Sequence, residues 1–289
     1  MIIAQPCWNL GLKCASRGSS ADTVYTAHGP ESANDFRQDY YLALMELALQ
    51  KTVKSHGAYK LRILPVGQNI IRGLAAAKSG QYENYFVRQS VSNELLQEMA
   101  AVPFPLDLGI TGYRVAFTSE KIKQELMQIK TFAQLKKLSI VQGLGWLDTD
   151  ILRANGFVVE TGSSYEGMFH MVAKNHLDLF PRGVNEFYRE WQNHQYIREL
   201  TFDESIALYY PLPRFFFTAQ KNQSASQRLY EGLVIAYHDG SLIKIWQKFY
   251  GQSLGFAQLE NRLIFTLENP FIQGIDKSYE QFIYQPTLN

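Results

Sequence analysis

The sequence predicts an α/β protein in which strands and helices alternate over two units. Between residues 23 and 80, short apolar runs alternate with amphipathic segments in the order strand, helix, strand, helix. The same alternation returns between residues 131 and 181. A chain of 289 residues is long enough for two domains of ordinary size. Because alternation of this kind is typical of parallel sheets, we expect helices on the faces of the sheets.

In the first unit, the apolar residues of the longest amphipathic segment crowd one side of a helix. These residues are Tyr41, Leu44, Met45, Leu47 and Leu49. Gly57 follows the lysines at the end of this segment and is expected to stop the helix. We expect the strands and helices of this unit at 23–27, 40–52, 59–66 and 69–80.

The second unit repeats the pattern with shorter elements. We expect helices at 131–138, 148–156 and 164–176, and strands at 138–143, 157–162 and 177–181. An apolar strand follows within residues 207–222, and two helices are expected at 224–240 and 241–251. Pro270 and Pro286 interrupt the tail from Leu259 onward, which we expect to form strand and coil packed on the first unit.

Composition excludes nucleic-acid binding and membrane spanning. The 28 Lys and Arg residues nearly balance 27 Asp and Glu residues, whereas neutralising phosphates requires a basic surplus. No stretch approaches the roughly 18 apolar residues of a membrane span. Residues 1–22 contain both cysteines, lack the pattern of a signal peptide, and are expected to form a leader or a disordered segment. A cysteine-free remainder fits an oxidising compartment.

The sequence matches none of the catalytic, cofactor-binding or metal-binding motifs considered below in full. Gly143 and Gly145 begin a dinucleotide-like pattern, but Asp148 stands where its third glycine is required. Glu166 occupies the position where a nucleophile elbow requires glycine. The six histidines include no metal-binding spacing. We therefore expect no cofactor, no metal site and no catalysis.

Polar turns at the ends of strands are the remaining candidates for a ligand-binding site, because ligands of open α/β sheets bind there. The segment 161–167 enters a helix, and its backbone N–H groups and side chains are suited to an anion. Its candidate residues are Thr161, Ser163, Ser164 and Tyr165. An ordinary N-cap with Glu166 in the first turn explains this segment equally well.

Three further strand ends supply candidates. Trp146 is placed to stack on a ligand, and we expect Asp148 to cap the next helix. Arg182 ends a strand in segment 180–186 and is expected to be the main anchor for an anionic group. The alternative is that Arg182 is structural, paired with Glu186 or Asp178.

The third of these strand ends precedes the first long helix. Glu31 and Arg37 lie there, and a surface pair between Asp35 and Arg37 is the alternative to ligand contact.

Several segments of the chain resemble the bacterial extracellular solute-binding proteins of the amino-acid-receptor type. They are TGSSYEGMF (161–169), FPRGVNE (180–186), LPRFFFTAQKN (212–222) and HDGSLIKIWQKFYG (238–251). The resemblance implies two lobes of the type II periplasmic-binding-protein fold, joined by hinge strands near residues 112–117 and 208–215. Lobe 1 would comprise residues 23–113 with 213–289, and lobe 2 residues 114–212.

The resemblance also implies a periplasmic monomer that holds a small polar ligand between its lobes. Such receptors usually bind the ligand carboxylate with an arginine, and Leu95 stands at that place here. Arg182, Arg114 or Arg37 would then supply the charge.

Three functions remain open on this basis. Delivery of an anionic or zwitterionic ligand to a membrane permease of an ABC-type importer comes first, and reporting ligand to a membrane sensor protein comes second. A third is a lyase or dehydratase on the same fold, which would use Asp148 or Glu186 with a raised pKa.

Overall fold

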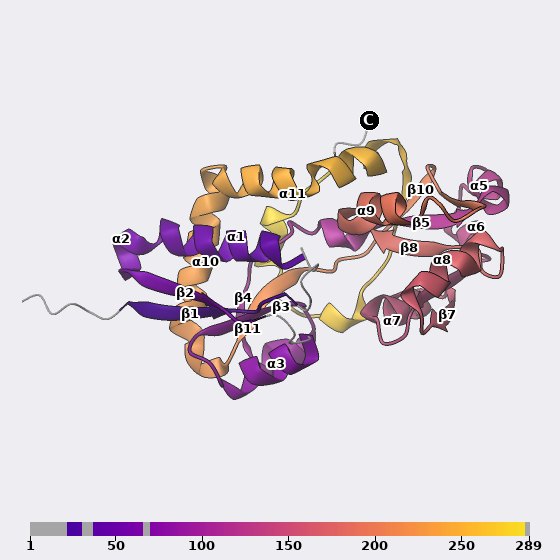
Figure 1. The fold of residues 1–289 in the computed structure, drawn as a ribbon. Helices are drawn as coiled ribbons and strands as arrows, with labels where there is room; N and C mark the ends of the chain where they lie inside the picture. Colours follow the sequence, from indigo (N-terminus) through magenta and orange to yellow (C-terminus); the bar gives the residue numbers. More distant parts are fainter. Residues whose placement is uncertain (1–21, 31–36, 66–69, 287–289) are drawn as a thin grey trace, which may run out of the picture.

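Two β-sheets organise the chain, and each forms the centre of one lobe (Figure 1). The computed structural model describes residues 22–30, 37–65 and 70–286. The first sheet has the order β2 (Tyr59–Ile63), β1 (Thr23–Ala27), β3 (Tyr85–Ser90), β11 (Arg214–Thr218) and β4 (Ala100–Val102). Strand β1 pairs in parallel with β2 and β3, whereas β11 pairs antiparallel with β3 and β4.

Helices cover both faces of the first sheet (Figure 1). Helix α1 (Arg37–Lys51) lies on one face beside α10 (Gln223–His238), and α3 (Ile70–Ser79) lies on the other. The short helices of this lobe are α2 (Val53–His56) and α4 (Asn93–Glu98). As predicted, a glycine ends the first helical segment: Gly57 is the C-cap of α2, with a φ of 82°.

The second sheet has the order β12 (Leu263–Thr266), β10 (Ile206–Tyr209), β5 (Tyr113–Ser119) and β8 (Phe180–Gly183), and β9 (Leu200–Phe202) also pairs with β5. A parallel pair, β6 (Ser139–Gly143) and β7 (Val158–Gly162), joins β8 through a bridge between Ile140 and Leu179. The helices of this lobe are α5 (Glu120–Leu126), α6 (Phe132–Leu135), α7 (Leu147–Ala154), α8 (Tyr165–Ala173) and α9 (Val184–His194).

Three expectations about the strands are wrong. The apolar run within 207–222 forms two strands, β10 and β11, in different sheets. Parallel pairing holds among β1, β2 and β3 and between β6 and β7, but β5 and β11 pair antiparallel with each of their neighbours because they arrive from the other lobe. The tail does not pack on the first lobe alone, because β12 pairs in parallel with β10 of the second sheet.

Helix α11 (Ser241–Ala257) reaches from one lobe to the other (Figure 1). It contacts α1 and α10 in the first lobe and α9 in the second. Ser253 near its end donates a hydrogen bond to the Val184 carbonyl at 2.5 Å and accepts one from the Tyr188 N–H at 3.2 Å. The chain then enters β12 and returns, so that the Tyr284 N–H bonds the Leu108 carbonyl at 2.9 Å. The lobes are therefore joined by α11 and the tail as well as by the two hinge connections.

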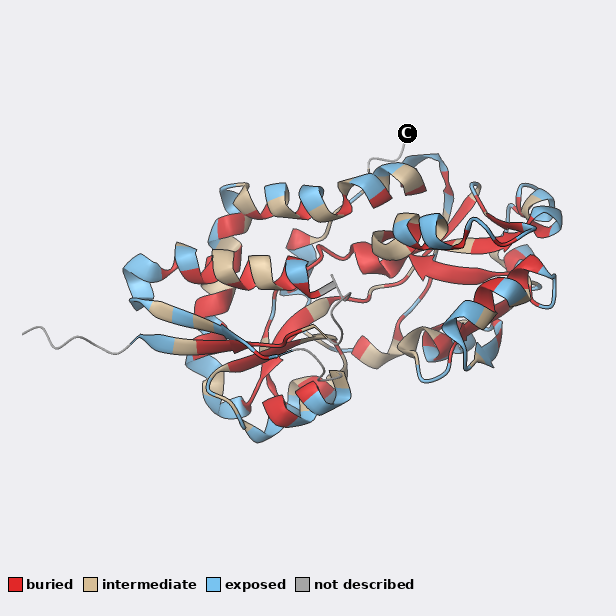
Figure 2. Cartoon of the chain, viewed as in Figure 1, coloured by how far each residue is buried: buried red, intermediate tan, exposed pale blue. Residues whose placement is uncertain are grey.

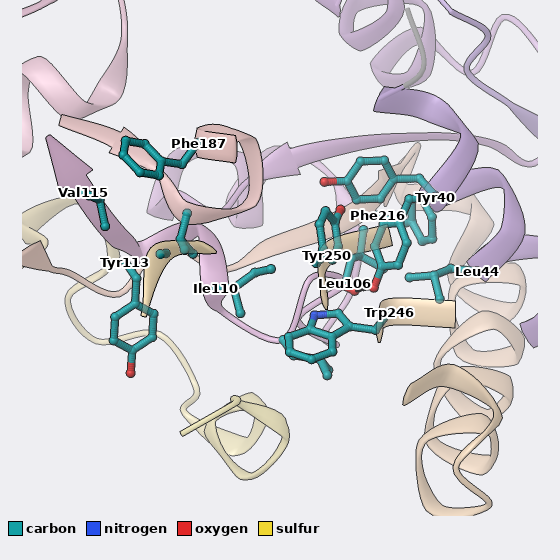
Figure 3. Close-up of a cluster of buried hydrophobic side chains, with 14 of the residues drawn as sticks. Tyr40, Leu44, Leu106, Ile110, Tyr113, Val115, Phe187, Phe216, Trp246 and Tyr250 are labelled. Carbon is teal, nitrogen blue, oxygen red and sulfur yellow. Dashed lines mark hydrogen bonds between the residues drawn. The ribbon is translucent and has the colours of Figure 1, made fainter. Parts of the chain in front are cut away.

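Buried residues occupy the central strands β3, β11, β5 and β8 and the inner sides of the helices, whereas the edge strands β2 and β12 are largely exposed or intermediate (Figure 2). Between α1 and α11, Tyr40 packs edge-on against Tyr250 at a centroid distance of 4.7 Å and donates a hydrogen bond to the Leu106 carbonyl (Figure 3). Trp246 donates to the Asp107 carbonyl at 3.1 Å. These contacts fix the first hinge connection, residues 103–112, against the helices that border the cleft.

Candidate functional site

A cavity of about 840 Å³ lies between the lobes. The first lobe contributes side chains from α1, β3, β11 and α11, and the second contributes side chains from β8, α8, α9 and the turn before α7. Its volume falls within the range of small-molecule sites, roughly 300–1,000 Å³. The residues used below are Tyr41, Arg88, Trp146, Tyr165, Arg182, Asn185, Glu186, Glu190 and Arg214.

Two arginines that line the cavity lie on neighbouring strands of the first sheet, β3 and β11. Arg214 of β11 pairs with Ser90 of β3, and Arg88 lies two residues earlier on β3. Because side chains two residues apart share a face, Arg88 and Arg214 lie diagonally on the same side of the sheet. Tyr41 of α1 contacts both: its ring lies 4.5 Å from the Arg88 guanidinium carbon, and its hydroxyl accepts a hydrogen bond from Arg214 Nη1 at 3.4 Å.

Asp107 lies close to these arginines and is completely buried. Its Oδ2 is 3.9 Å from Arg214 Nη1, and neither carboxylate oxygen accepts a hydrogen bond from the described residues. Burial raises the pKa of Asp107, while Arg214 and Arg88 lower it by a smaller amount. The two guanidinium groups therefore lie near one buried carboxylate, whose ion pair with Arg214 is long.

On the opposite wall of the cavity, which the second lobe forms, Arg182 makes ion pairs with two carboxylates of α9. Its Nε lies 2.9 Å from both oxygens of Glu190, and its Nη2 lies 2.8 Å from Glu186 Oε2. Tyr165 donates a further hydrogen bond to Glu190 at 2.7 Å. Burial alone lowers the pKa of Arg182, but Glu190 and Glu186 raise it above its usual value. The guanidinium of Arg182 is thus charged and chelated within its own lobe.

Aromatic rings surround the same guanidinium. Its central carbon lies 4.7 Å from the Trp146 ring centroid, 5.2 Å from that of Phe180 and 5.6 Å from that of Tyr165. These distances are within the range of cation–π attraction, so the rings fix the orientation of Arg182. The predicted stacking surface of Trp146 is therefore occupied in part by a protein side chain.

Arg114 and Asp148 form a second ion pair behind this wall. Arg114 Nη2 lies 2.7 Å from Asp148 Oδ1, and Tyr210 donates a hydrogen bond to the same oxygen. Asp148 does not cap α7 as expected: the N-cap is Trp146, and Asp148 lies in the first turn with its side chain turned to Arg114. The strong charge partner draws the carboxylate away from the backbone N–H groups.

The structure brings only some of the predicted residues to the cavity. Those that line it are Trp146, Tyr165, Arg182 and Glu186. Thr161 and Ser163 are exposed and outside the lining, and Ser164 is the N-cap of α8, accepting from the Gly167 N–H at 3.1 Å. The observed role of Ser164 is thus the N-cap, which was the alternative to anion binding. Glu31 lies outside the described residues, and Arg37 begins α1 but its side chain lies outside the described part.

Sequence reasoning missed Arg88, Arg214 and Glu190. Glu190 stands one helical turn after Glu186, a spacing that places both carboxylates on one face of α9 and was visible in the sequence. An arginine inside an apolar strand is a similar signal at Arg88 and Arg214. Asn185 belongs to the candidate segment 180–186, and its Oδ1 is buried without a hydrogen-bond partner among the described residues.

No family model matches the chain, and no curated protein matches it. Solved structures do match. YckB of Bacillus subtilis has a TM-score of 0.57 and 18% identity, over 85% of this chain and 96% of YckB. A periplasmic binding protein of Salmonella typhimurium with high arginine specificity has a TM-score of 0.51 and 12% identity, over 80% of this chain and 100% of that one.

A third match is a periplasmic His/Glu/Gln/Arg/opine family-binding protein of Silicibacter pomeroyi in complex with lysine. It has a TM-score of 0.53 and 10% identity, over 80% of this chain and 97% of that one. These matches confirm the predicted fold class: the chain has the two-lobed α/β fold of type II periplasmic binding proteins.

Proposed function

We propose that this protein is a periplasmic solute-binding protein that captures a small anionic or zwitterionic ligand between its lobes and passes it to an ABC-type importer. One observation carries the proposal: arginines from both lobes face a single cavity of ligand size. The fold supports it, because two lobes joined at a hinge close around a ligand by a small rotation. A ligand that touches both walls would stabilise the closed form.

The two acids considered for lyase or dehydratase chemistry, Asp148 and Glu186, do not have the pKa that this chemistry requires. A general acid at neutral pH needs a raised pKa. Burial by itself raises the pKa of Glu186, but Arg182 and neighbouring arginines outweigh it and lower the pKa below the usual value. Asp148 follows the same pattern with Arg114. Both carboxylates are therefore held as anions, which suits binding and ion pairing.

Among the described residues, no cluster suited to a metal ion is present and no helix is long and apolar enough to cross a membrane.

Ligand binding is tested by thermal unfolding in the presence of amino acids, small carboxylates, polyamines and short peptides. A compound that binds only the folded state raises the melting temperature, and at 100 times its Kd it adds about 2.7 kcal/mol to the free energy of unfolding. Compounds that shift the melting temperature are then titrated by calorimetry. We expect saturable binding of an anionic or zwitterionic compound at one site per chain. A melting temperature that no compound raises would contradict solute binding.

A further inference from the structure

We propose that Arg88 and Arg214 together bind the carboxylate of the ligand. They do so on the first-lobe floor of the cavity, which is the side formed by Tyr41, Arg88 and Arg214. This inference rests on the proposed solute-binding function and assigns the anion to a site different from those expected from the sequence. Leu95 cannot bind a carboxylate, and it is buried in the core of the first lobe. The charge must therefore come from elsewhere in the cavity.

The two walls of the cavity differ in how far their arginines are already neutralised. Arg182 is bonded to two carboxylates, Glu186 and Glu190, and adding a ligand carboxylate would bring a third anion to one cation. On the first-lobe floor, the nearest carboxylate to the two cations is Asp107, 3.9 Å from Arg214, and Glu186 of the opposite wall also attracts both guanidinium groups. An incoming anion is thus repelled near Arg182 and attracted near Arg88 and Arg214.

The unused hydrogen-bond donors of Arg88 and Arg214 also indicate that the ligand carboxylate binds there. The Nε of Arg88 is buried and has no hydrogen-bond partner among the described residues, and the guanidinium otherwise rests on the ring of Tyr41. A buried donor without a partner is costly in a folded protein and is expected where a ligand supplies the acceptor. Among the described residues, Arg214 has a long hydrogen bond to Tyr41 and the long ion pair to Asp107, so its donors are also under-used.

The geometry suits a single carboxylate. The two arginines lie diagonally across neighbouring strands, with side chains within reach of one another, and both border the cavity. A carboxylate has two oxygens and accepts bonds from two donors side by side. Tyr41 positions both guanidinium groups, one through its ring and the other through its hydroxyl. On this floor, two guanidinium groups and the Asp107 carboxylate leave one positive charge before Glu186 of the opposite wall is counted.

The test compares carboxylic acids with their primary amides in wild type, Arg88→Gln and Arg214→Gln. The pairs are L-phenylalanine with L-phenylalaninamide, L-leucine with L-leucinamide, and benzoate with benzamide, titrated by calorimetry. We expect wild type to prefer an acid over its amide. Each variant should weaken binding of that acid by about ten- to a hundred-fold and leave binding of the amide nearly unchanged.

Two further variants separate binding from folding. Arg214→Gln leaves Asp107 buried without its partner, so Arg214→Gln combined with Asp107→Asn removes both charges and should fold while still losing the acid preference. Arg198→Gln is the matched control, because the Arg198 side chain is 94% exposed and does not line the cavity, and it should retain wild-type affinity.

The outcomes distinguish this inference from the function on which it rests. Binding by wild type with equal affinity for acid and amide overturns the carboxylate site and leaves solute binding intact. Unchanged acid affinity in both variants has the same meaning. If wild type binds neither these compounds nor any amino acid or small carboxylate of the thermal screen, the carboxylate site and the proposed ligand class are both overturned.

Discussion

Arg182 and Glu190 form a buried ion pair in which the Nε of the arginine lies 2.9 Å from each carboxylate oxygen. The side chains are only 10% and 9% exposed, so the pair is largely shielded from water. It joins the end of β8 to the middle of α9, and Glu186 adds a second contact to the same guanidinium at 2.8 Å. The wall of the cleft thus depends on a charge cluster that is complete within the protein.

Arg182→Gln should therefore destabilise the empty protein. Removing one partner of a buried pair leaves the other charge without compensation, and we expect a loss of about 3–5 kcal/mol in the free energy of unfolding. Urea denaturation without ligand measures this loss. Arg198→Gln serves as the exposed control and should change the stability by less than about 0.5 kcal/mol. Unchanged stability combined with lost ligand affinity would instead favour Arg182 as the ligand anchor.

The ion pair between Arg114 and Asp148 should make stability depend on pH. Burial raises the pKa of Asp148, but Arg114 and the Tyr210 hydrogen bond lower it below the usual value of 3.8. The carboxylate therefore stabilises the fold fully above pH 3.8 or so, and this contribution is lost as the pH falls through the lower folded-state pKa. Asp148→Asn should cost roughly 1–3 kcal/mol at pH 7.

The difference between wild type and Asp148→Asn should shrink as the pH is lowered from 5 to 2. Urea denaturation at each pH supplies the free energies of unfolding. Asp150→Asn is the control, because Asp150 is an exposed carboxylate in the same turn of α7. A difference that stays constant down to pH 2 would show that the charge of Asp148 contributes nothing.

Two helical glycines should respond in opposite directions to alanine. A Cβ added at Gly232 of α10 would lie 2.1 Å from the Ala48 carbonyl oxygen of α1, so Gly232→Ala forces the two helices apart. We expect a loss of about 1–3 kcal/mol or more. Gly251 of α11 has open space around the corresponding position, and Gly251→Ala should gain about 0.5–1 kcal/mol because alanine favours the helix.

Thermal and urea unfolding of the two glycine variants decide this prediction. The two changes are chemically identical and both lie inside long helices, so each serves as the control for the other. Equal effects of the two substitutions would mean that the close approach of α1 and α10 does not limit the residue at position 232.

The local sequence determined most of the secondary structure and the fold class. Strands and helices follow the periodicity of apolar residues, which is a local property, and glycines such as Gly57 end helices through their own backbone freedom. The N-cap at Ser164 and the shared face of Glu186 and Glu190 also follow from spacing along one helix. For the same reason, the sequence identified Trp146, Tyr165, Arg182 and Glu186, which follow strand ends and line the cavity.

Only the tertiary structure decided which charges are already satisfied. Arg182 is chelated and Arg88 is not, although both are arginines on apolar strands, because their partners depend on which elements pack beside them. Arg88 and Arg214 are 126 positions apart and meet through pairing of β3 with β11. β12 likewise joins the second sheet through an exposed edge of β10. Strand pairing and ion pairing join residues distant in the chain, and local periodicity contains no information about such contacts.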